Sequence, residues 1–390
     1  MARKTLGYGR QLVDEEDVAA VVEVLRGDSL TCGPAIEAFE RALADTCGAR
    51  HVVAVSNGTS ALRLIYRVAG VGPGTRVGVP AITFAATATQ ALALGAEVVL
   101  LDVDPTTLLL TPEILDACRE PLDFVVPVHM AGRLCDMQAL ADIAQRRGIT
   151  LLEDAAHALG STLIDGTRCG DLAFSRGATF SFHPVKNITT AEGGAVAVND
   201  DAWAARLKSL RHHGVARDSF HGTLAAHDGG APWYHEFHDI SGNDRLSDLH
   251  AALGLSQLRK LARFKAERAN IHQRYCDAFS ALDGVTLPPA APGQLPCWHL
   301  FQLQLDWKQL QITRREFFAR AAADGLQLQV HYIPLHHQPV LASCARASSL
   351  AGADHAYQRL VTLPCFPGFT SSQHSHVIDF ILSLCERVTA

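Results

Sequence analysis

The 390-residue sequence lacks the features that mark membrane, secreted and nucleic-acid-binding proteins. No apolar run is long enough to span a membrane, and the first residues, MARKTLGYGR, contain no apolar stretch followed by a small-residue cleavage site. Long blocks of like charge are absent and the formal net charge is −6, which argues against a basic surface for nucleic acid. We therefore expect a soluble cytoplasmic protein with no membrane and no nucleic-acid partner.

Paired metal-binding or redox cysteines are also missing, because none of the ten cysteines lies in a Cys-x-x-Cys arrangement. The thiols are therefore expected to be reduced and mostly buried. Histidine is plentiful, with 19 residues, and two pairs are adjacent, His212-His213 and His336-His337. Adjacent side chains are expected to diverge, and no cysteine or carboxylate spacing accompanies these pairs. We predict no metal site.

The composition that is present, 48% hydrophobic and 19% charged, is that of a globular protein of about two domains. Between about residues 50 and 200, short apolar runs such as HVVAV and EVVLL alternate with helical segments such as Met137–Arg147. Valine- and leucine-rich strands that alternate with helices predict an α/β fold with a mostly parallel sheet between helices.

The second half of the chain has a different pattern. Residues 214–243 have neither helical nor strand period, and a loop of this length is typically functional or mobile. Residues 245–282 predict one or two long amphipathic helices, followed by strands near 299–305 and 326–332 around a helix at Arg314–Ala323. We predict a large domain at residues 1–260, a smaller C-terminal α/β domain at 261–390, and an N-terminal helix that packs on the small domain.

Asp154, in the segment LLEDAAHALG, follows a buried strand, where ligand chemistry is common in open α/β sheets. A carboxylate there can pair with a cationic ring nitrogen. A pyridoxal cofactor needs such a partner, because its protonated pyridine acts as an electron sink. An acid that only caps the next helix is the alternative.

Lys186, in TFSFHPVKNITTAEGG, lies in a loop after the strand that follows Asp154. Shielding by Phe182 and Val185 would lower the pKa of its amine and make it a nucleophile. The Gly193-Gly194 pair permits a tight turn or a close backbone approach nearby. A surface lysine with no chemical role is the alternative.

Two further segments complete a possible cofactor site. The strand-to-helix turn SNGTSA can hold a phosphate through free backbone N–H groups and the hydroxyls of Thr59 and Ser60, although a plain helix cap has the same pattern. Phe84, after the strand ending at Pro80, can stack on a planar ring or simply pack in the core.

Together these segments resemble fold-type-I pyridoxal-phosphate enzymes and, more narrowly, the sugar aminotransferases of the DegT/DnrJ/EryC/StrS family. The resemblance runs from about Tyr8 to about Pro367 and is carried by SNGTSAL, EDAAHALG, SFHPVK…EGG and LPCFPG. It implies a fold-type-I pyridoxal-phosphate-dependent transferase that uses pyridoxal 5′-phosphate.

The resemblance also implies a role for each matching residue. Lys186, Asp154 and His157 would be catalytic: Lys186 as the Schiff-base lysine, Asp154 at the pyridine nitrogen and His157 near the phenolic oxygen. Five further residues would contact the cofactor. Thr59, Ser60 and Ser181 would bind its phosphate and Phe84 would stack on its ring, while Asn243 would reach the phosphate of the cofactor in the neighbouring subunit. Asn243 implies a homodimer with shared active sites. Asp244 and Ala191 replace an aromatic residue and a glycine that are usual in the family.

Within the family, GYGRQLVDEEDVAAVVEVL, VPVHMAGRLCDM and HYIPLHHQP are most similar to UDP-4-amino-4,6-dideoxy-N-acetyl-beta-L-altrosamine transaminases. This similarity implies transfer of an amino group from L-glutamate to C4 of a UDP-linked 4-keto-6-deoxy-HexNAc, in biosynthesis of the pseudaminic acid type. Candidate contacts to the sugar or diphosphate, each also explicable by packing, are Tyr8, Arg10, His183, His331 and Tyr332.

Three other functions remain compatible with such a chain. The acceptor can be another nucleotide-linked keto-sugar, of the perosamine, bacillosamine or 4-amino-arabinose type. Sugar dehydratases of the family carry histidine at the Schiff-base position, so lysine at 186 argues against that chemistry. A non-catalytic regulatory protein on the same fold is the third alternative, because a fold alone does not fix function.

Overall fold

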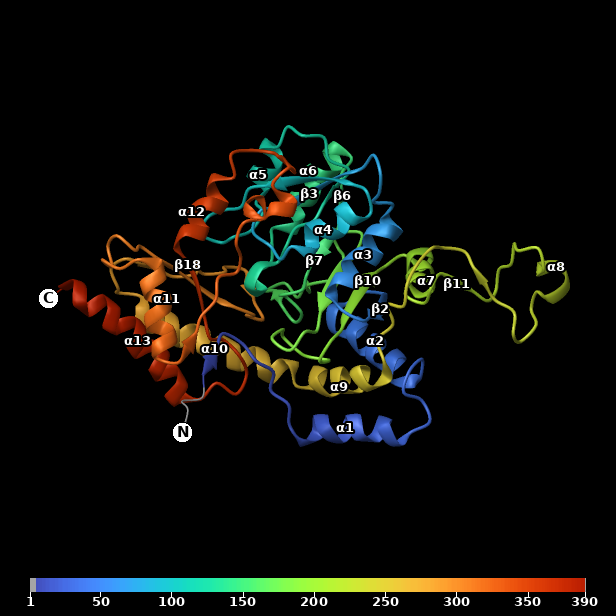
Figure 1. The fold of residues 1–390 in the computed structure, drawn as a ribbon, viewed down its shortest axis with the longest axis horizontal. Helices are drawn as coiled ribbons and strands as arrows, with labels where there is room; N and C mark the ends of the chain where they lie inside the picture. Colours follow the sequence, from blue (N-terminus) through green and yellow to red (C-terminus); the bar gives the residue numbers. More distant parts are fainter. Residues whose placement is uncertain (1–4, 390) are drawn as a thin grey trace.

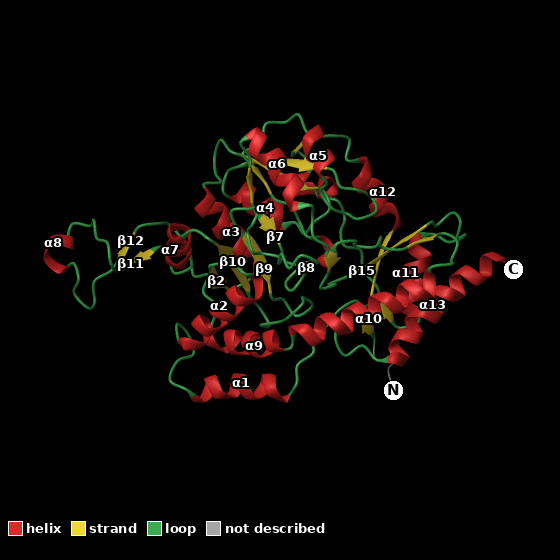
Figure 2. Ribbon diagram, turned by 180° about the vertical axis from the view of Figure 1, so that it is seen from behind, coloured by secondary structure: helices red, strands yellow, loops and turns green. Residues whose placement is uncertain are grey.

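The computed structural model describes residues 5–389, with side chains described up to residue 384. A mixed sheet lies at its centre, between layers of helices (Figures 1 and 2). The helices are α1 (Glu15–Arg26), α2 (Pro34–Cys47), α3 (Gly58–Ala69), α4 (Ala86–Ala93), α5 (Pro112–Ala117), α6 (Met137–Arg147), α7 (Asp201–Leu210), α8 (Ala225–Asp228), α9 (Asp248–Arg259), α10 (Leu261–Phe279), α11 (Arg314–Ala323), α12 (Ala351–Arg359) and α13 (Ser371–Thr389).

Most strands of the first half of the chain lie where the apolar runs predict them, but the short strands at Leu6–Gly7 and Thr162–Leu163 were not predicted. The strands of this half are β1 (Leu6–Gly7), β2 (His51–Val55), β3 (Arg76–Pro80), β4 (Glu97–Leu101), β5 (Phe124–Val125), β6 (Thr150–Leu151), β7 (Glu153–Asp154), β8 (Thr162–Leu163), β9 (Ala178–Ser181) and β10 (Gly194–Val198). Later strands are β11 (Val215–Ala216), β12 (Glu236–Phe237), β13 (Val285–Thr286), β14 (Gln294–Leu295), β15 (Phe301–Leu305), β16 (Leu326–Gln327), β17 (Ala345–Arg346) and β18 (Leu360–Leu363).

The central sheet joins two groups of strands, in the orders β17-β4-β3-β5-β6 and β2-β10-β9-β7. The groups meet where β6 continues into β7, and a parallel bridge between Val128 and Asp154 links them across the gap. Only β10 runs antiparallel to its neighbours in these two groups. The prediction of a mostly parallel sheet between helices is confirmed.

Local sequence signals set the ends of the helices that follow the strands. The Asn57 side chain accepts a hydrogen bond from the Ser60 N–H at the start of α3, and Asp136 does the same at the start of α6. Gly70 and Gly148 end these helices in the left-handed conformation, with φ of 90° and 68°. Because the strands are parallel, their carboxyl ends and the loops that follow them lie at one edge of the sheet.

Three apolar cores hold the layers together. The first joins the sheet to α3 and α6, and the second joins its other face to α2 and α9. The third lies among α10, α11, α13 and the strands β15 and β18, and includes Leu6 of β1. This separate core contains part of the predicted small domain, and β1 is added to it by pairing with β16. The predicted range 261–390 is wrong in part, because α12 packs in the first core and β17 pairs with β4 at the edge of the central sheet.

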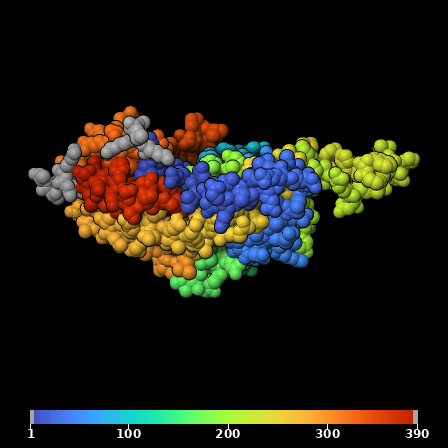
Figure 3. Space-filling view, turned by 90° about the horizontal axis from the view of Figure 1, so that it is seen from below, coloured from blue at the N-terminus to red at the C-terminus, as the bar shows by residue number. Residues whose placement is uncertain are grey.

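The position of α1 differs from the prediction. It packs along α9, which belongs to the predicted large domain, rather than on the small domain. The contact includes a polar cluster: the buried Asp17 accepts one hydrogen bond from Gln257 and pairs with Lys260 at 3.0 Å, where α9 passes into α10. Figure 3 shows α1 in blue beside the gold α9–α10 segment on this face.

Residues 214–243, which have no regular period in the sequence, form an arm that projects from the body of the molecule (Figure 1). The arm contains the short antiparallel pair β11–β12 and the single-turn helix α8. Its apolar side chains have no core to enter: Trp233, Phe237 and Ile240 are 71%, 64% and 97% exposed.

Two predictions from composition can be checked against the described residues. The cysteines described by the structure are all free, and most of them are buried, as expected; the side chain of Cys385 lies outside the described part. Across residues 5–389, none of the helices has the length and apolar character needed to cross a membrane.

Candidate active site

A cavity of about 530 Å³ opens at the carboxyl ends of the parallel strands and is closed on one side by the segment that precedes η2 (Leu335–His337). It brings together most of the predicted site residues from distant parts of the chain. Those that line it are Tyr8, Thr59, Phe84, Asp154, His157, Ser181, His183, Lys186, His331 and Tyr332. Ser60, Arg10 and Asn243 are not among the lining residues.

Asp154 is fixed in place by two hydrogen bonds. One carboxylate oxygen accepts the Ala156 N–H at 3.1 Å, and the other accepts the Thr87 hydroxyl at 2.8 Å. The bond from Ala156 closes a turn, which is the local role that the alternative interpretation gave to Asp154. The carboxylate nevertheless also lines the cavity. The side chain is only 5% exposed, so an ionised carboxylate here favours a cationic partner in the cavity.

Thr87 is a site residue that the sequence pattern did not indicate. Its hydroxyl can accept the proton of the Thr83 hydroxyl at 3.0 Å. Its own proton can go to the Phe84 carbonyl at 3.1 Å or to the nearer Asp154 oxygen at 2.8 Å. This chain of hydroxyls ties the loop that carries Phe84 to the acid. The one sequence feature that could have indicated Thr87 as a site residue is its position, as a polar residue in the first turn of the helix that follows a parallel strand.

Lys186 extends from the loop after β9 into the cavity. Burial lowers the pKa of its amine from 10.5 to about 8, and the Asp154 carboxylate opposes part of this shift. Burial disfavours the ammonium form, so a much larger fraction of the amine is neutral near neutral pH than for an ordinary lysine. A neutral amine is the form that attacks a carbonyl carbon.

We expect acetylation of Lys186 in the cofactor-free protein to rise with pH, with a midpoint near the pKa of about 8. Only the neutral amine reacts, so roughly a tenth is reactive at pH 7, against roughly one in three thousand for a pKa of 10.5. Peptide mass spectrometry after brief labelling from about pH 6 to about pH 10 measures the profile. An unfolded sample is the control, and a profile that matches it would contradict the shift.

His157 faces the cavity in its neutral form. Burial lowers the pKa of its imidazole well below 6.5, and the positive charges of Lys186 and His331 lower it further. The Ala131 N–H donates to Nδ1 at 3.4 Å, so the remaining proton sits on Nε2, 3.2 Å from the Tyr332 hydroxyl. His157 therefore presents an N–H donor to this side of the cavity.

His299 is a second cavity residue that the sequence reading missed. Its ring lies 4.4 Å from that of His157, and burial likewise holds its pKa well below 6.5. The segment at residues 331 and 332 covers the same side: the Tyr8 and His331 rings are 4.6 Å apart, and those of Phe84 and Tyr332 are 6.1 Å apart.

The start of α3 forms an open cradle at another wall of the cavity. The hydroxyls of Thr59 and Ser181 line it and have no hydrogen-bond partner among the described residues. A Cβ on Gly58 would lie 2.9 Å from the Ser181 Cβ, and one on Gly194 would lie 2.5 Å from the Asn57 backbone. Glycine at both positions therefore lets the turn approach β9 and β10 closely, as predicted for Gly194.

Ser60 lies beside this cradle but its hydroxyl is engaged elsewhere. It donates to the Asp244 carboxylate at 2.7 Å, and Arg63 pairs with the same oxygen. Asp244 is buried, with one carboxylate oxygen that has no partner within the described chain. The aspartate that replaces the family's usual aromatic residue thus occupies the hydroxyl predicted to bind phosphate.

Asn243 and Arg10 also lie away from the cavity of this chain. Asn243 is exposed and accepts a hydrogen bond from the Arg245 N–H at 3.3 Å, close to where the arm leaves the body. The Arg10 guanidinium stacks 5.2 Å above the Phe366 ring and lines a separate hollow of about 80 Å³. Neither residue can reach the cavity without another chain or a movement of the segment.

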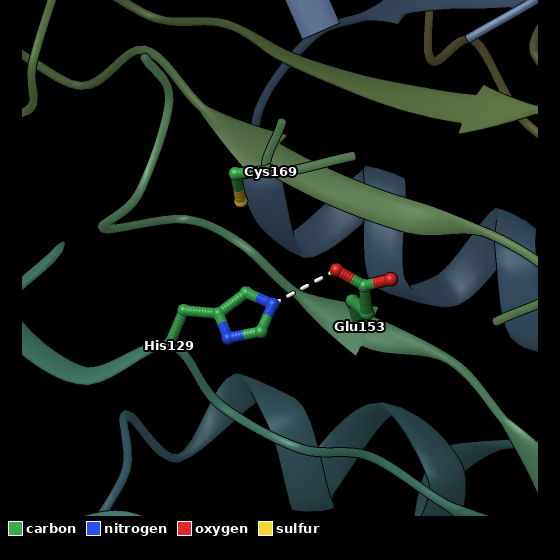
Figure 4. Close-up of side chains that lie close together, drawn as sticks. All are labelled: His129, Glu153 and Cys169. Atoms are coloured by element: carbon green, nitrogen blue, oxygen red, sulfur yellow. Dashed lines mark hydrogen bonds and ion pairs between the residues drawn. The ribbon is translucent and has the colours of Figure 1, made fainter. Parts of the chain in front are cut away.

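Behind the sheet, His129, Glu153 and Cys169 gather in a buried cluster (Figure 4). The His129 ring donates to Glu153 at 2.8 Å, and its other nitrogen accepts the Cys135 N–H at 3.1 Å. Burial alone would lower the pKa of this imidazole, but its bonds with Cys135 and Glu153 outweigh burial and raise the pKa to about 10. A proton therefore stays between Nε2 and Glu153, where a metal would have to bind. The cluster is a hydrogen-bonded support on the face of β7 opposite Asp154.

The predicted divergence of His336 and His337 is wrong. Both Nε2 atoms reach the same Asp354 oxygen, at 2.9 and 2.7 Å, because the chain turns in η2 toward α12. These three side chains have metal-ligand character. A metal on Nε2 of His336 would require the ring proton to sit on Nδ1. That nitrogen is buried and has no hydrogen-bond partner among the described residues, so the proton would have no acceptor.

A sheet edge that presents an acid, a lysine amine and a helix N-terminus to one cavity defines a fold-type-I pyridoxal-phosphate-dependent enzyme. The chain belongs to the DegT/DnrJ/EryC1/StrS aminotransferase family, whose sequence profile matches residues 11–382. It is therefore a pyridoxal-phosphate-dependent aminotransferase, and the regulatory-protein alternative is set aside.

Individual relatives agree with this assignment. The chain is 33% identical over 380 residues to the spore coat polysaccharide biosynthesis protein SpsC of Bacillus subtilis (strain 168), covering 96% of each chain. It is 30% identical to the aminotransferase TlmJ from Streptoalloteichus hindustanus, covering 99% of this chain and 100% of TlmJ with a TM-score of 0.89. A third similar protein is PseC of Helicobacter pylori, an aminotransferase involved in the biosynthesis of pseudoaminic acid. It is 26% identical, with coverage of 98% and 100% and a TM-score of 0.89.

The residues that line the cavity fit pyridoxal phosphate. The unpartnered hydroxyls of Thr59 and Ser181, with the first N–H groups of α3, suit a phosphate, and the glycines leave room for it. Asp154 suits a protonated ring nitrogen, and Lys186 supplies an amine of lowered pKa.

Proposed function

We propose that the protein transfers the amino group of L-glutamate to C4 of a UDP-linked 4-keto-6-deoxy-HexNAc, in biosynthesis of the pseudaminic acid type. The observation that carries the chemistry is the Lys186 amine in the same cavity as the buried Asp154 carboxylate. When bound, pyridoxal phosphate supplies an electron sink for the carbon that loses its proton.

The proposed roles of the side chains follow from their positions. Lys186 would hold the cofactor through its amine, and that amine, when free, would accept the proton from Cα of glutamate and act as the acid that gives it up again. Asp154 holds the ring nitrogen in its protonated form, and His157 donates its Nε2–H to an oxygen on the cavity side. Thr59 and Ser181 bind the phosphate, and Phe84 covers one edge of the site.

The choice of sugar is supported by likeness rather than by a contact. The N-terminal, VPVHMAGRLCDM and HYIPLHHQP segments are similar to those of the pseudaminic-acid-type transaminases, and the fold is close to that of PseC. His331 and Tyr332, from the third of these segments, line the cavity next to Tyr8. We propose that these three residues and His183 face the sugar.

An assay of purified holoenzyme with glutamate and a panel of UDP- and dTDP-linked keto-sugars tests the proposal. We expect 2-oxoglutarate and an amino sugar, identified by mass spectrometry, with UDP-linked 4-keto-HexNAc substrates. Turnover only with perosamine- or arabinose-type substrates would reject the proposed acceptor class. Turnover only with the bacillosamine-type 4-keto-6-deoxy-HexNAc would reject the pseudaminic-acid-type stereochemistry, and either result would keep the aminotransferase assignment.

We further propose a homodimer with shared active sites, because the cavity has too little positive charge for its substrates. Lys186 is the only lysine or arginine among the described lining residues. Burial keeps His157 and His299 neutral, and burial together with Lys186 lowers the pKa of His331 to about 4. Glutamate and a UDP-sugar both carry two negative groups, so further cations must come from outside the described cavity lining, and we propose that a second copy supplies them.

The projecting arm is the segment that we expect a second copy to cover. Exchanging Trp233 and Ile240 together for serine should convert the dimer to monomers and lower activity, since the arm would lose its two most exposed large apolar groups. Light scattering after size-exclusion chromatography measures the mass. Ile164→Ser, at a 69% exposed position on the body, is the matched control. A dimer that survives the double exchange would exclude the arm as the main contact.

A further inference from the structure

Arg268, on α10, is a buried cation with no carboxylate partner. Its side chain is among the most buried in the protein, at 1% exposure, and no acid lies within ion-pair distance in the part of the chain that the structure describes. Within the described residues, the hydrogen bonds of its guanidinium all go to main-chain carbonyls, and its Nε has no partner. A buried charge compensated only by dipoles is costly, so the packing of an apolar core does not explain this residue.

The carbonyls that Arg268 binds belong to two walls of the cavity. One guanidinium nitrogen donates to the Lys186 carbonyl at 3.1 Å and to that of Val185 at 3.5 Å. The other donates to the carbonyls of Cys365 at 2.7 Å and His299 at 3.1 Å, and more weakly to that of Trp298. Lys186 and His299 both line the cavity, so a single planar group sets the distance between their main chains.

Neighbouring bonds leave the Lys186 backbone few ways to move except through Arg268. The Lys186 N–H donates to the His183 carbonyl at 2.9 Å, which closes a turn on its amino side. The Asn187 side chain donates to the Cys297 carbonyl at 2.8 Å, next to the Trp298–His299 segment. On the carboxyl side, the Lys186 carbonyl itself accepts a hydrogen bond only from the Arg268 guanidinium among the described residues, while Asn187 makes a second link to the opposite wall.

We propose that Arg268 is a positioning residue. It holds the main chain of Lys186 at a fixed distance from the opposite cavity wall, and proton transfer by the Lys186 amine requires that distance. The proposal rests on the role proposed above for Lys186. Arg268 does not touch the cavity contents; it acts through the backbone that carries the amine. A lysine at this position would supply one point charge in place of the planar fork that spans both walls.

The test uses the cofactor-loaded holoenzyme and the rate of the glutamate half-reaction in a single turnover, followed by the visible absorbance of the cofactor. We expect Arg268→Lys to lower the maximum rate about tenfold and Arg268→Ala about 100-fold, with the concentration of glutamate at half-maximal rate changed less than about threefold. Methylguanidinium added to Arg268→Ala should restore part of the rate in a saturable way, because it can refill the site between the carbonyls.

Tyr275→Phe provides the stability control. Tyr275 is fully buried on the same helix and donates to the Pro364 carbonyl at 3.0 Å, so its loss should lower the melting temperature and leave the half-reaction unchanged. If Arg268→Lys lowers the melting temperature as Tyr275→Phe does but keeps the wild-type rate, Arg268 is only structural and the proposal is overturned. If Lys186→Ala itself transfers normally, it is the proposed role of Lys186 that fails.

Discussion

Exchange of Lys186 for alanine is expected to lower the rate of amino transfer from glutamate about 10⁴-fold, while the protein still folds and retains bound pyridoxal phosphate non-covalently. The amine is proposed as both the covalent anchor and the base that moves the Cα proton, and a positioned base contributes about 10²- to 10⁴-fold on its own. No other lysine lines the cavity among the described residues, and burial keeps the nearby imidazoles of His157 and His299 as weak bases.

Single-turnover absorbance after mixing with glutamate measures this loss. Small primary amines added to the Lys186→Ala protein should accelerate the reaction according to their basicity, because they can replace the missing amine in the cavity of about 530 Å³. Lys186→Arg is the control that keeps a cation of similar size but cannot act as a base near neutral pH. A Lys186→Ala rate above about a hundredth of the wild-type rate would remove Lys186 from the role of base.

Exchange of Asp154 for asparagine is expected to lower the same rate about 10²- to 10³-fold and to weaken cofactor binding far less. Asparagine keeps the shape: its single amide oxygen can still accept from the Ala156 N–H, and its amide nitrogen can donate to the Thr87 hydroxyl. It carries no charge to hold a ring nitrogen in its protonated form. Phosphate binding depends on the cradle at the start of α3, which this exchange does not alter.

The rate and the cofactor content are measured on the same samples, so the two effects separate. Thr87→Val, which removes one hydrogen bond to Asp154 and keeps its charge, should cost about tenfold or less. An Asp154→Asn protein with full cofactor and a wild-type rate would show that the carboxylate supports only the turn at Ala156.

The periodicity of the chain was enough to place the sheet and the edge at which the site lies. Alternating apolar runs gave β2, β3, β4, β9 and β10 within a few residues, and α6 and α11 at their observed ends. Strand-length apolar runs bounded by turn residues are local signals, so they can be read without long-range contacts. The same signals predicted that Asp154 and Lys186 follow neighbouring strands, and the structure pairs β7 with β9.

Residues that act through distant partners could not be found in this way. Thr87, His299 and Arg268 carry no motif, and each gains its position from contacts with residues far along the chain. The packing of α1 on α9 was mispredicted for the same reason, because its buried Asp17 finds partners 240 residues away. Long-range pairs depend on how the layers pack, which period and composition do not encode.

The sequence by itself determined the class of fold, the edge of the sheet that carries chemistry, and the acid, lysine and hydroxyls that meet there. Only the tertiary structure decided the state of those groups. Burial lowers the pKa of Lys186 to about 8 and keeps His157 neutral, while Asp244 takes the hydroxyl of Ser60. Residue type and spacing fix which groups are available, whereas dielectric surroundings and hydrogen-bond partners exist only once the chain is packed.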